Sequence, residues 1–308
     1  MLCALGAATL LARATAAEPA AEKPPATANP LLARSPLPYQ LPPFEAIKDE
    51  HFRPAFEQGM TENLREVGAI ATNPAAPTLE NTIIALERSG ELLDRTRTAF
   101  SILTGAYTNP NLDKLDSELS PRLAAHSDAI TLNHALFVRI KALYDQRQAL
   151  KLDPESARLL ERYYKDFVRA GALLSEADKT VLKAMNTELA SLSTQFKQNL
   201  LKDTNASAIL VDTREELAGF SDNAITAAAA AAKAAGQEGK FLVRLTNTTG
   251  QPPLDSLQNR AVRERVMAAS LARGSRGGEF DNRAIVAGLA KLRAERAVLL
   301  GYANHAAF

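Results

Sequence analysis

Residues 175–200 read SEADKTVLKAMNTELASLSTQFKQNL, a stretch typical of a long amphipathic helix. Ser175 and Asp178 have the spacing of a capping box, in which side chains satisfy free backbone N–H groups at a helix start. The apolar side chains that follow recur every three or four residues, and they are Val181, Leu182, Met185, Leu189, Leu192, Phe196 and Leu200. We interpret this stripe as helix–helix core and not as a cofactor groove.

Similar helix signals occur along most of the chain. Apolar residues recur from Leu79 to Leu103 after a Pro-Thr start, which predicts one long helix. Asp153 followed by Pro154 predicts another helix start, because Asp caps and Pro fits the first helical position. Further helices are predicted in the ranges 115–136, 254–273 and 280–300. The Gly-rich residues 274–278 lack the pattern of a phosphate-binding loop and predict a flexible connector.

Strand signals are confined to one region. Residues 208–211 and 241–245 are short β-branched and apolar runs bounded by Asp, Asn and Gly. Between them, residues 213–216 and the alanine run 227–232 predict two small helices. The fold class predicted for the chain is therefore mainly α, a multi-helix structure with two short strands around 208–245.

The composition is that of a globular protein. The chain has 308 residues, 46% of them hydrophobic, and 36 Lys and Arg against 35 Asp and Glu give a net charge of +1. Wholesale disorder is excluded by this balance, and a nucleic-acid-binding surface over the whole protein is disfavoured because phosphate binding needs a basic footprint. The single cysteine, Cys3, excludes an intrachain disulfide and a cysteine-based zinc site.

The N-terminus has features of an export signal. Residues 2–12 form a short apolar run, and Ala14-Thr15-Ala16 matches a cleavage site, although no basic leader precedes the run. We predict a signal peptide over 1–16 and a Pro/Ala-rich linker over 17–43 that stays extended. The alternative is an unstructured Ala-rich tail. A periplasmic location, with no membrane attachment after signal removal, follows if the signal is real, and a cytoplasmic one otherwise.

The four histidines do not form a metal-binding motif. His51, His126, His134 and His305 are scattered, and none belongs to His-Glu-x-x-His, which places two imidazoles on one helix face. His126 and His134 are eight residues apart and lack the one-turn spacing of that pair. We interpret all four as surface or core residues and not as ligands.

Several polar residues near the end of the chain are candidates for ligand contact: Glu279, Asp281, Arg283, Arg293, Glu295, Arg296 and Tyr302. The first three lie at a predicted helix start, where acidic residues are expected for capping alone. The next three are typical of a solvated or ion-paired helix face. Tyr302 is expected to pack against further polypeptide or to face a channel. No catalytic, cofactor-binding or metal-binding residue is therefore assigned.

Short motifs follow one another along the chain in a characteristic order: NPLL (29–32), LPPF (41–44), HFRPAF (51–56), PTLENTI (77–83), ALERSG (85–90), LLERY (159–163), DFVRAG (166–171), LSTQF (192–196), GEFDNR (278–283), LRAERA (292–297) and LLGY (299–302). Together they resemble the N-terminal half of the M3 family of zinc metallopeptidases, the thimet oligopeptidase-like group. Within that family the resemblance is strongest to bacterial peptidyl-dipeptidases.

The resemblance implies a fold and an activity. Family members are almost entirely helical ellipsoids with a deep channel, act on short peptides, and bind one zinc through His-Glu-x-x-His and a later glutamate. The peptidyl-dipeptidases release dipeptides from free C-termini. The zinc ligands lie in the second half of the sequences of family members, so no zinc ligand is assigned to this chain. The chain alone is predicted to be inactive. It would form one channel wall, with an N-terminal helical domain over 44–250 and a truncated start of the catalytic domain over 251–308.

Other classes of protein remain open on sequence alone. A non-catalytic helical periplasmic binding or adaptor protein, or a purely structural bundle, would have the same apolar stripes. No fixed-period repeat supports a solenoid scaffold. If the peptidase interpretation holds, the complete protein is expected to be a monomer, and His-Glu-x-x-His is expected to follow Phe308 in the coding DNA.

Overall fold

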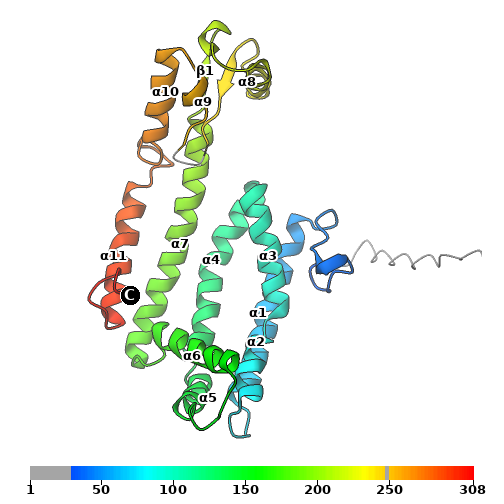
Figure 1. Ribbon diagram of the computed structural model, residues 1–308, viewed down its shortest axis with the longest axis vertical. Coiled ribbons are helices and arrows are strands. Elements are labelled where there is room, and N and C mark those ends of the chain that lie inside the picture. The colour runs from blue at the N-terminus through cyan, green and yellow to red at the C-terminus, as the bar shows by residue number, and fades with distance from the viewer. Residues whose placement is uncertain (1–28, 247–249) are drawn as a thin grey trace, which may run out of the picture.

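The computed structural model describes residues 29–246 and 250–308 (Figure 1). The predicted signal peptide and Cys3 lie outside the described residues. The molecule has three parts: a lower body of long helices, a pair of helices that crosses its lower end, and an upper lobe at the far end of the longest helix.

The lower body is built from five helices that pack side by side. They are α1 (Asp49–Ala71), α3 (Glu91–Ala106), α4 (Pro110–Thr131), α7 (Glu176–Ala206) and α11 (Arg283–Leu299). Helix α1 packs on α3 and α4, α4 runs along α7, and α7 packs on α11 (Figure 1). Three phenylalanines hold the contact between α1 and α3, because Phe52 and Phe56 both meet the ring of Phe100 edge to face.

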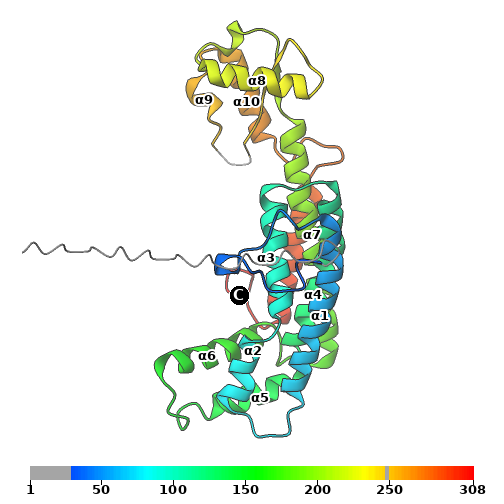
Figure 2. The same cartoon turned by 90° about the vertical axis from the view of Figure 1, so that its right-hand side faces the viewer.

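The lower end of the body is crossed by α5 (His134–Asp145) and α6 (Pro154–Arg169), as Figure 2 shows. They pack on each other and on a π-helical turn, η2 (Leu79–Ile84), which leads directly into α2 (Ala85–Glu87). Stacked aromatic rings line this contact, and the ring centroids of Tyr144 and Tyr164 lie 3.8 Å apart. A short 3-10 turn, η1 (Pro38–Gln40), precedes α1.

The upper lobe surrounds the far end of α7. Strands β1 (Ile209–Val211) and β2 (Phe241–Val243) pair antiparallel, with Leu210 opposite Leu242. The remaining elements of the lobe are η3 (Glu215–Leu217), α8 (Asp222–Ala234), α9 (Pro253–Ser256) and α10 (Arg260–Leu271). One apolar core joins residues from Val211 to Ala269. This core includes residues on both sides of residue 250, where the predicted domain boundary lies. The boundary stays a prediction.

The predicted fold class is confirmed, and so are its two strands and its clearest helix starts. Ser175 accepts a hydrogen bond from the backbone N–H of Asp178 at the start of α7, and Asp153 accepts from Glu155 and Ser156 at the start of α6. The predicted stripe of α7 is mostly inward, although Val181 is exposed. These helix starts could be predicted from the local sequence alone, because the capping side chain and the backbone groups that it bonds lie within three residues of each other.

The long helix predicted from Leu79 to Leu103 is wrong. The chain breaks at Gly90, whose φ of 78° ends one helical segment and begins α3. A β-carbon at this position would lie 2.8 Å from Asn63 Nδ2, and the Gly90 N–H donates to Glu66 Oε2. Contacts from α1 therefore fix a backbone conformation that favours glycine. The helix predicted over 254–273 is likewise divided, because Asn259 caps a new start at α10.

The linker expected over 17–43 differs from the structure in its described part. Leu31 is 2% exposed and lies in the core between α1, α3 and α4. Its carbonyl accepts a hydrogen bond from Arg95, and Asn29 donates to the carbonyl of His51. Residues 29–35 therefore pack on the helical body instead of extending away from it.

The Gly-rich turn at 274–278 was predicted to be a flexible connector, but hydrogen bonds to α7 hold it in place. Asp203, near the end of α7, accepts hydrogen bonds from the Gly274 N–H at 2.9 Å and from Arg276 Nε at 3.1 Å. Asn199 donates to Asn282 Oδ1, and the Asn282 N–H donates to the Gly274 carbonyl. This network ties α7 to the connection between α10 and α11.

Candidate functional site

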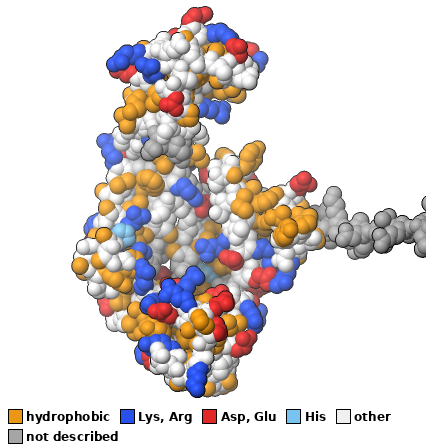
Figure 3. Space-filling model, viewed as in Figure 1, with side chains coloured by type: hydrophobic (Ala, Val, Ile, Leu, Met, Phe, Trp, Pro, Cys, Tyr) orange, Lys and Arg blue, Asp and Glu red, His pale blue; other side chains and the backbone are white. Residues whose placement is uncertain are grey.

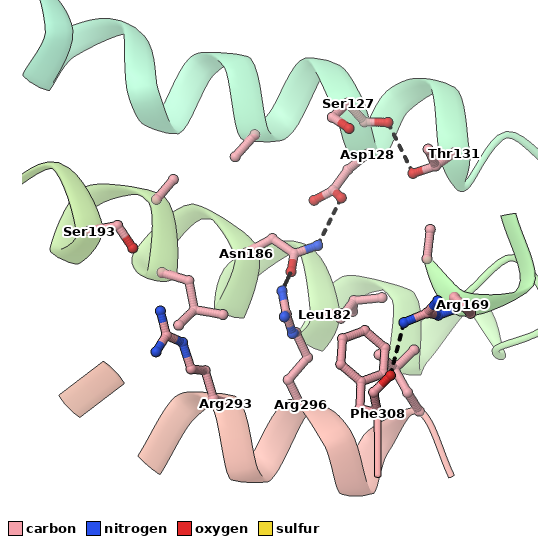
Figure 4. Close-up of a pocket in the computed structure, with 15 residues that line it drawn as sticks. Ser127, Asp128, Thr131, Arg169, Leu182, Asn186, Ser193, Arg293, Arg296 and Phe308 are labelled. Carbon is pink, nitrogen blue, oxygen red and sulfur yellow. Dashed lines mark hydrogen bonds between the residues drawn. The ribbon is translucent and has the colours of Figure 1, made fainter. Parts of the chain in front are cut away.

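A cavity of about 430 Å³ lies between α4, α7 and α11, with the end of α6 and Phe308 at one end (Figure 4). Ligand pockets in proteins are typically about 300–1,000 Å³, so this one has the size of a small-molecule site. The residues labelled in Figure 4 supply most of its polar lining: Ser127, Asp128, Thr131, Arg169, Asn186, Ser193, Arg293 and Arg296.

Asp128 on α4 is the most deeply buried charged group of the cavity, with 5% of its surface exposed. Its Oδ1 accepts a hydrogen bond of 2.8 Å from Asn186 Nδ2, while Oδ2 has no partner among the described residues. Burial raises the pKa of Asp128 above its usual value, although the Asn186 hydrogen bond and the charges of Lys183 and Arg296 oppose the shift. One acceptor oxygen of Asp128 is therefore buried without a hydrogen-bond donor among the described residues.

Two arginines of α11 line the opposite side. Arg296 is half-buried and donates from Nη1 to Asn186 Oδ1 at 3.2 Å, and Arg293 lies one turn earlier. Burial lowers the pKa of Arg296, and the positive charge of Arg293 lowers it further. Neither arginine forms an ion pair within residues 29–246 and 250–308. Asn186 thus separates Arg296 from Asp128, and its amide bonds to both.

Arg169 and Phe308 close one end of the cavity. Arg169 donates from Nη2 to the Phe308 carbonyl oxygen at 2.9 Å. Both Arg169 and Arg296 place their guanidinium carbons over the Phe308 ring, at 5.5 and 5.3 Å from its centroid. Cation–π attraction therefore adds to the hydrogen bond that holds the ring in place.

A second hollow of about 770 Å³ lies beside α2 and α3, but most of its charged groups are already satisfied. Arg34 pairs with Glu91, and the Tyr163 hydroxyl donates to Glu87 at 2.6 Å. On the face shown in Figure 3, acidic and basic side chains are interspersed over the body and the lobe. The unpaired charges of the first cavity make it the stronger candidate.

Some of the polar residues singled out in the sequence do not line the cavity, among them Asp281, Tyr302 and Glu279. The Arg283 side chain donates to Asp281, which also accepts hydrogen bonds from the N–H groups of Arg283 and Gly277, and these contacts lower the pKa of Asp281 to about 2. Asp281 thus bonds to the first residue of α11, although the N-cap residue itself is Asn282, which makes no side-chain cap. Tyr302 meets the Phe308 ring edge to face at 5.2 Å. Glu279 is exposed.

The solvated or ion-paired face expected for Arg293, Glu295 and Arg296 is wrong for Arg296. Glu295 lies outside the cavity and pairs with Lys291 at 3.8 Å, as an exposed helical pair does. Arg296 is half-buried and both arginines line the cavity. Residue spacing could not show this, because the cavity side of α11 is defined by α4 and α7.

Asp128 and Asn186 were missed by reasoning from the sequence. Asn186 carried a usable signal, since it lies between Leu182 and Leu189 at helical spacing and so places an amide on the apolar stripe of α7. A polar group on a buried stripe needs a partner, and that partner proved to be Asp128. Asp128 itself had no comparable signal.

The histidines take structural positions. His51 Nδ1 accepts a hydrogen bond from the Lys48 N–H at the start of α1, and His126 Nε2 pairs with Asn63 Oδ1 at 2.8 Å. Burial lowers the pKa of His126. His134 and His305 are exposed. In the described part of the chain, no group of three or more His, Cys, Asp or Glu side chains could hold a metal ion, so these residues do not fit a zinc site.

Replacing Asp128 with asparagine is expected to stabilise the protein at pH 7 by about 1 kcal/mol. Asparagine keeps an oxygen for Asn186 Nδ2 and removes the buried charge. Because the folded state raises the pKa of Asp128, ionisation favours unfolding. This cost is absent below about pH 3.9, the unfolded pKa of Asp, grows as the pH rises from there to the raised folded pKa, and is constant above it.

Urea denaturation at pH 4 and pH 7 measures this effect. The gain in unfolding free energy should be larger at pH 7 than at pH 4, and an Asp166→Asn variant on exposed α6 serves as the control. A variant that is less stable than wild type at pH 7 would show that the carboxylate of Asp128 stabilises the fold.

Known proteins resemble this chain over most of its length. No family model matches the chain. Dipeptidyl carboxypeptidase of Salmonella typhimurium is 47% identical over 280 residues, and that of Escherichia coli is 44% identical over 282 residues. This chain is a homologue of the N-terminal part of these dipeptidyl carboxypeptidases, which are M3-family metallopeptidases. The resemblance predicted from its motifs is thereby confirmed.

A second group of relatives is more distant. Oligopeptidase A of Salmonella typhimurium is 28% identical over 282 residues. The alignments with these three proteins cover 90–92% of the present chain and 41% of each relative. The chain therefore spans about two fifths of the length of the peptidases that it matches.

None of the helices in the described ranges is long and apolar enough to cross a membrane.

Proposed function

We propose that this chain is the N-terminal part of a zinc metallopeptidase that releases dipeptides from the C-termini of short peptides. The observation that carries the proposal is the identity of 44–47% to two dipeptidyl carboxypeptidases over 91–92% of the chain. The corresponding identity to oligopeptidase A is 28%, which favours dipeptide release over internal cleavage.

The role proposed for the residues present here is to form a channel wall. The sequence contains no His-Glu-x-x-His, and the described residues do not fit a metal site. We therefore assign no chemical step to any side chain of this chain. Its contribution is a helical wall that bounds the space in which an unfolded peptide lies, while the reacting groups come from other parts of the polypeptide.

The protein encoded by the whole gene tests this proposal with N-acetyl-tetraalanine as substrate. Release of dialanine is expected. Metal chelation should lower this activity more than about 100-fold, and addition of zinc should restore it. The 308-residue chain expressed alone is expected to release no dipeptide. Mass spectrometry of the products distinguishes dipeptide release from internal cleavage.

A C-terminally amidated substrate is the matched control, because a peptidyl-dipeptidase acts at a free C-terminus. Cleavage that survives complete metal removal would contradict the zinc mechanism. A coding sequence without any peptidase half would instead favour the second candidate, a non-catalytic helical binding or adaptor protein.

We also propose that the protein is a periplasmic monomer from which residues 1–16 are removed. The apolar run at 2–12 and the Ala14-Thr15-Ala16 site support export. N-terminal sequencing of the protein from a periplasmic extract tests the location, and a cytoplasmic protein that begins at Met1 would contradict it.

A further inference from the structure

A chain of hydrogen bonds connects α4 and α1 to the break before α3. On α4, His126 Nε2 lies 2.8 Å from Asn63 Oδ1, which belongs to α1. Asn63 Nδ2 donates to Ser89 Oγ at 3.3 Å, and Ser89 Oγ donates to the Leu86 carbonyl oxygen at 2.8 Å. Three segments that are far apart in the sequence are therefore joined through their side chains.

The directions of these hydrogen bonds fix the proton on His126. A hydroxyl group has one proton, and Ser89 uses it on the Leu86 carbonyl, so Ser89 Oγ accepts from Asn63. The Asn63 amide then presents its oxygen to His126, which must donate. A neutral imidazole carries one N–H group, so the proton lies on Nε2 and Nδ1 is left without one.

Nδ1 of His126 is buried where a second proton has no acceptor. The residue is 8% exposed, and Nδ1 has no hydrogen-bond partner among the described residues. A proton on Nδ1 would create a buried charged N–H group without an acceptor, which is costly. Burial lowers the pKa of His126, and the positive charge of Arg97 on α3 lowers it further. The site therefore holds the imidazole in its neutral form.

The charged groups on the surrounding helices do not offset this cost. Glu66 of α1 accepts from the Gly90 N–H, and Arg122 of α4 pairs with Glu57. Helix α7 packs on the side of α4 that holds Asp128, and residues two positions apart on a helix point in nearly opposite directions. The other titratable groups near Gly90 line the hollow beside α2 and α3, and they are Arg34, Glu87, Arg88, Glu91, Asp94 and Tyr163. None of these groups forms a hydrogen bond with His126 Nδ1.

Asn63 also packs directly against the break that the chain makes at Gly90. A β-carbon at Gly90 would lie 2.8 Å from Asn63 Nδ2, and the φ of Gly90 is 78°. Asn63, Ser89 and Gly90 all line the hollow of about 770 Å³ beside α2 and α3. A change in the position of Asn63 therefore reaches both the break and the hollow.

We propose that His126 is an acid-sensitive latch of this break. When Nδ1 takes a proton from solvent, the imidazole turns out of its buried site to reach water, Asn63 loses the donor that orients it, and the segment at Ser89 and Gly90 loosens. Loss of that proton restores the contact. The latch is independent of the peptidase activity proposed above, because it uses only contacts among α1, α4 and the connection between α2 and α3.

The pH range of the latch follows from the lowered pKa of His126. When the segment is open, the imidazole titrates at about pH 6.5, its ordinary value. The closed segment therefore keeps its full stability above that pH, loses stability as the pH falls from about 6.5 to the lowered pKa, and loses no more below it. The population of the open segment grows by at most about 10-fold for each pH unit in this range.

Amide hydrogen exchange of the whole gene product, measured by mass spectrometry at about pH 7.5 and about pH 5.5, tests the latch. The Gly90 amide reports on the break because its N–H donates to Glu66. After correction for the intrinsic effect of pH on exchange, its protection in wild type should fall about 2-fold or more on acidification. His126→Gln keeps an N–H donor for Asn63 but does not titrate, so its Gly90 protection should be the same at the two pH values.

His134→Gln is the matched control, because it removes the same kind of side chain from an exposed position on α5. Its loss of Gly90 protection should equal that of wild type. Hydrogen exchange at the imidazole C2 position measures the pKa of His126 in the wild-type protein, so the latch is tested even if His126→Gln does not fold. The measured pKa should lie below about 6.5.

Three results would overturn the proposal. The first is a wild-type protection of Gly90 that is equal at the two pH values. The second is an equal loss of protection in wild type and His126→Gln, which would assign the acid effect to another group. The third is a pKa of His126 at or above about 6.5, which would show that the buried site accepts the charged imidazole.

Discussion

Replacement of Phe56 by alanine is expected to lower the free energy of unfolding by about 3–5 kcal/mol. The Phe56 side chain is fully buried in the core between α1, α3 and α4. Its ring centroid lies 5.3 Å from that of Phe100 in an edge-to-face contact, and Phe100 makes a similar contact with Phe52. The substitution therefore removes a large apolar group and leaves a cavity between two long helices.

Leu64→Ala on the same helix is the control for this prediction. Leu64 is 40% exposed, so its truncation should cost about 1 kcal/mol or less. Urea denaturation monitored by far-UV circular dichroism measures both variants. Equal destabilisation by the two substitutions would show that the α1–α3 contact does not limit the stability of the protein.

Asp203→Ala is expected to lower the free energy of unfolding by about 3 kcal/mol. Asp203 is 6% exposed and accepts hydrogen bonds from the Gly274 N–H and from Arg276 Nε. Its removal leaves a buried N–H group and a part-buried guanidinium without their acceptor. Thermal unfolding measures the loss of stability, and amide hydrogen exchange at Gly274 shows whether the turn has been released.

Two further variants separate charge from hydrogen bonding. Asp203→Asn keeps an acceptor for Gly274 and should lose less stability than Asp203→Ala. Asp212→Ala removes an exposed partner of Lys240 in the upper lobe and should cost about 1 kcal/mol or less. If Gly274 keeps its protection in Asp203→Ala, the turn is held by other contacts.

The helices that could be predicted from the sequence are those whose starts are fixed locally. The caps at Asp153 and Ser175 involve side chains and backbone groups within three residues, and both were predicted. The break at Gly90 could not be predicted from its own segment, because the periodic apolar pattern continues through it. It depends on Asn63 and Glu66, which lie 27 and 24 residues earlier in α1.

The candidate site was less accessible to sequence reasoning than the fold. Asp128 and Asn186 form a hydrogen bond across 58 residues, and Arg296 joins them from a third helix. Each residue alone is an ordinary polar position on an amphipathic helix. The sequence shows the period of each stripe, but the residues that lie at the edges of the stripes acquire a role only when three helices meet.

Helix α7 has a mechanical consequence for the cavity. Its 31 residues contain neither glycine nor proline, and at 1.5 Å per residue it is about 46 Å long. The cavity is formed at its lower half, by Leu182, Asn186 and Leu189, and the upper lobe surrounds its other end. The upper end of α7 lies about 30 Å from Asn186, so a tilt of about 5° at the cavity would displace that end by about 3 Å. Helix α7 can therefore act as a lever arm that converts a small change in side-chain packing into a movement of the lobe.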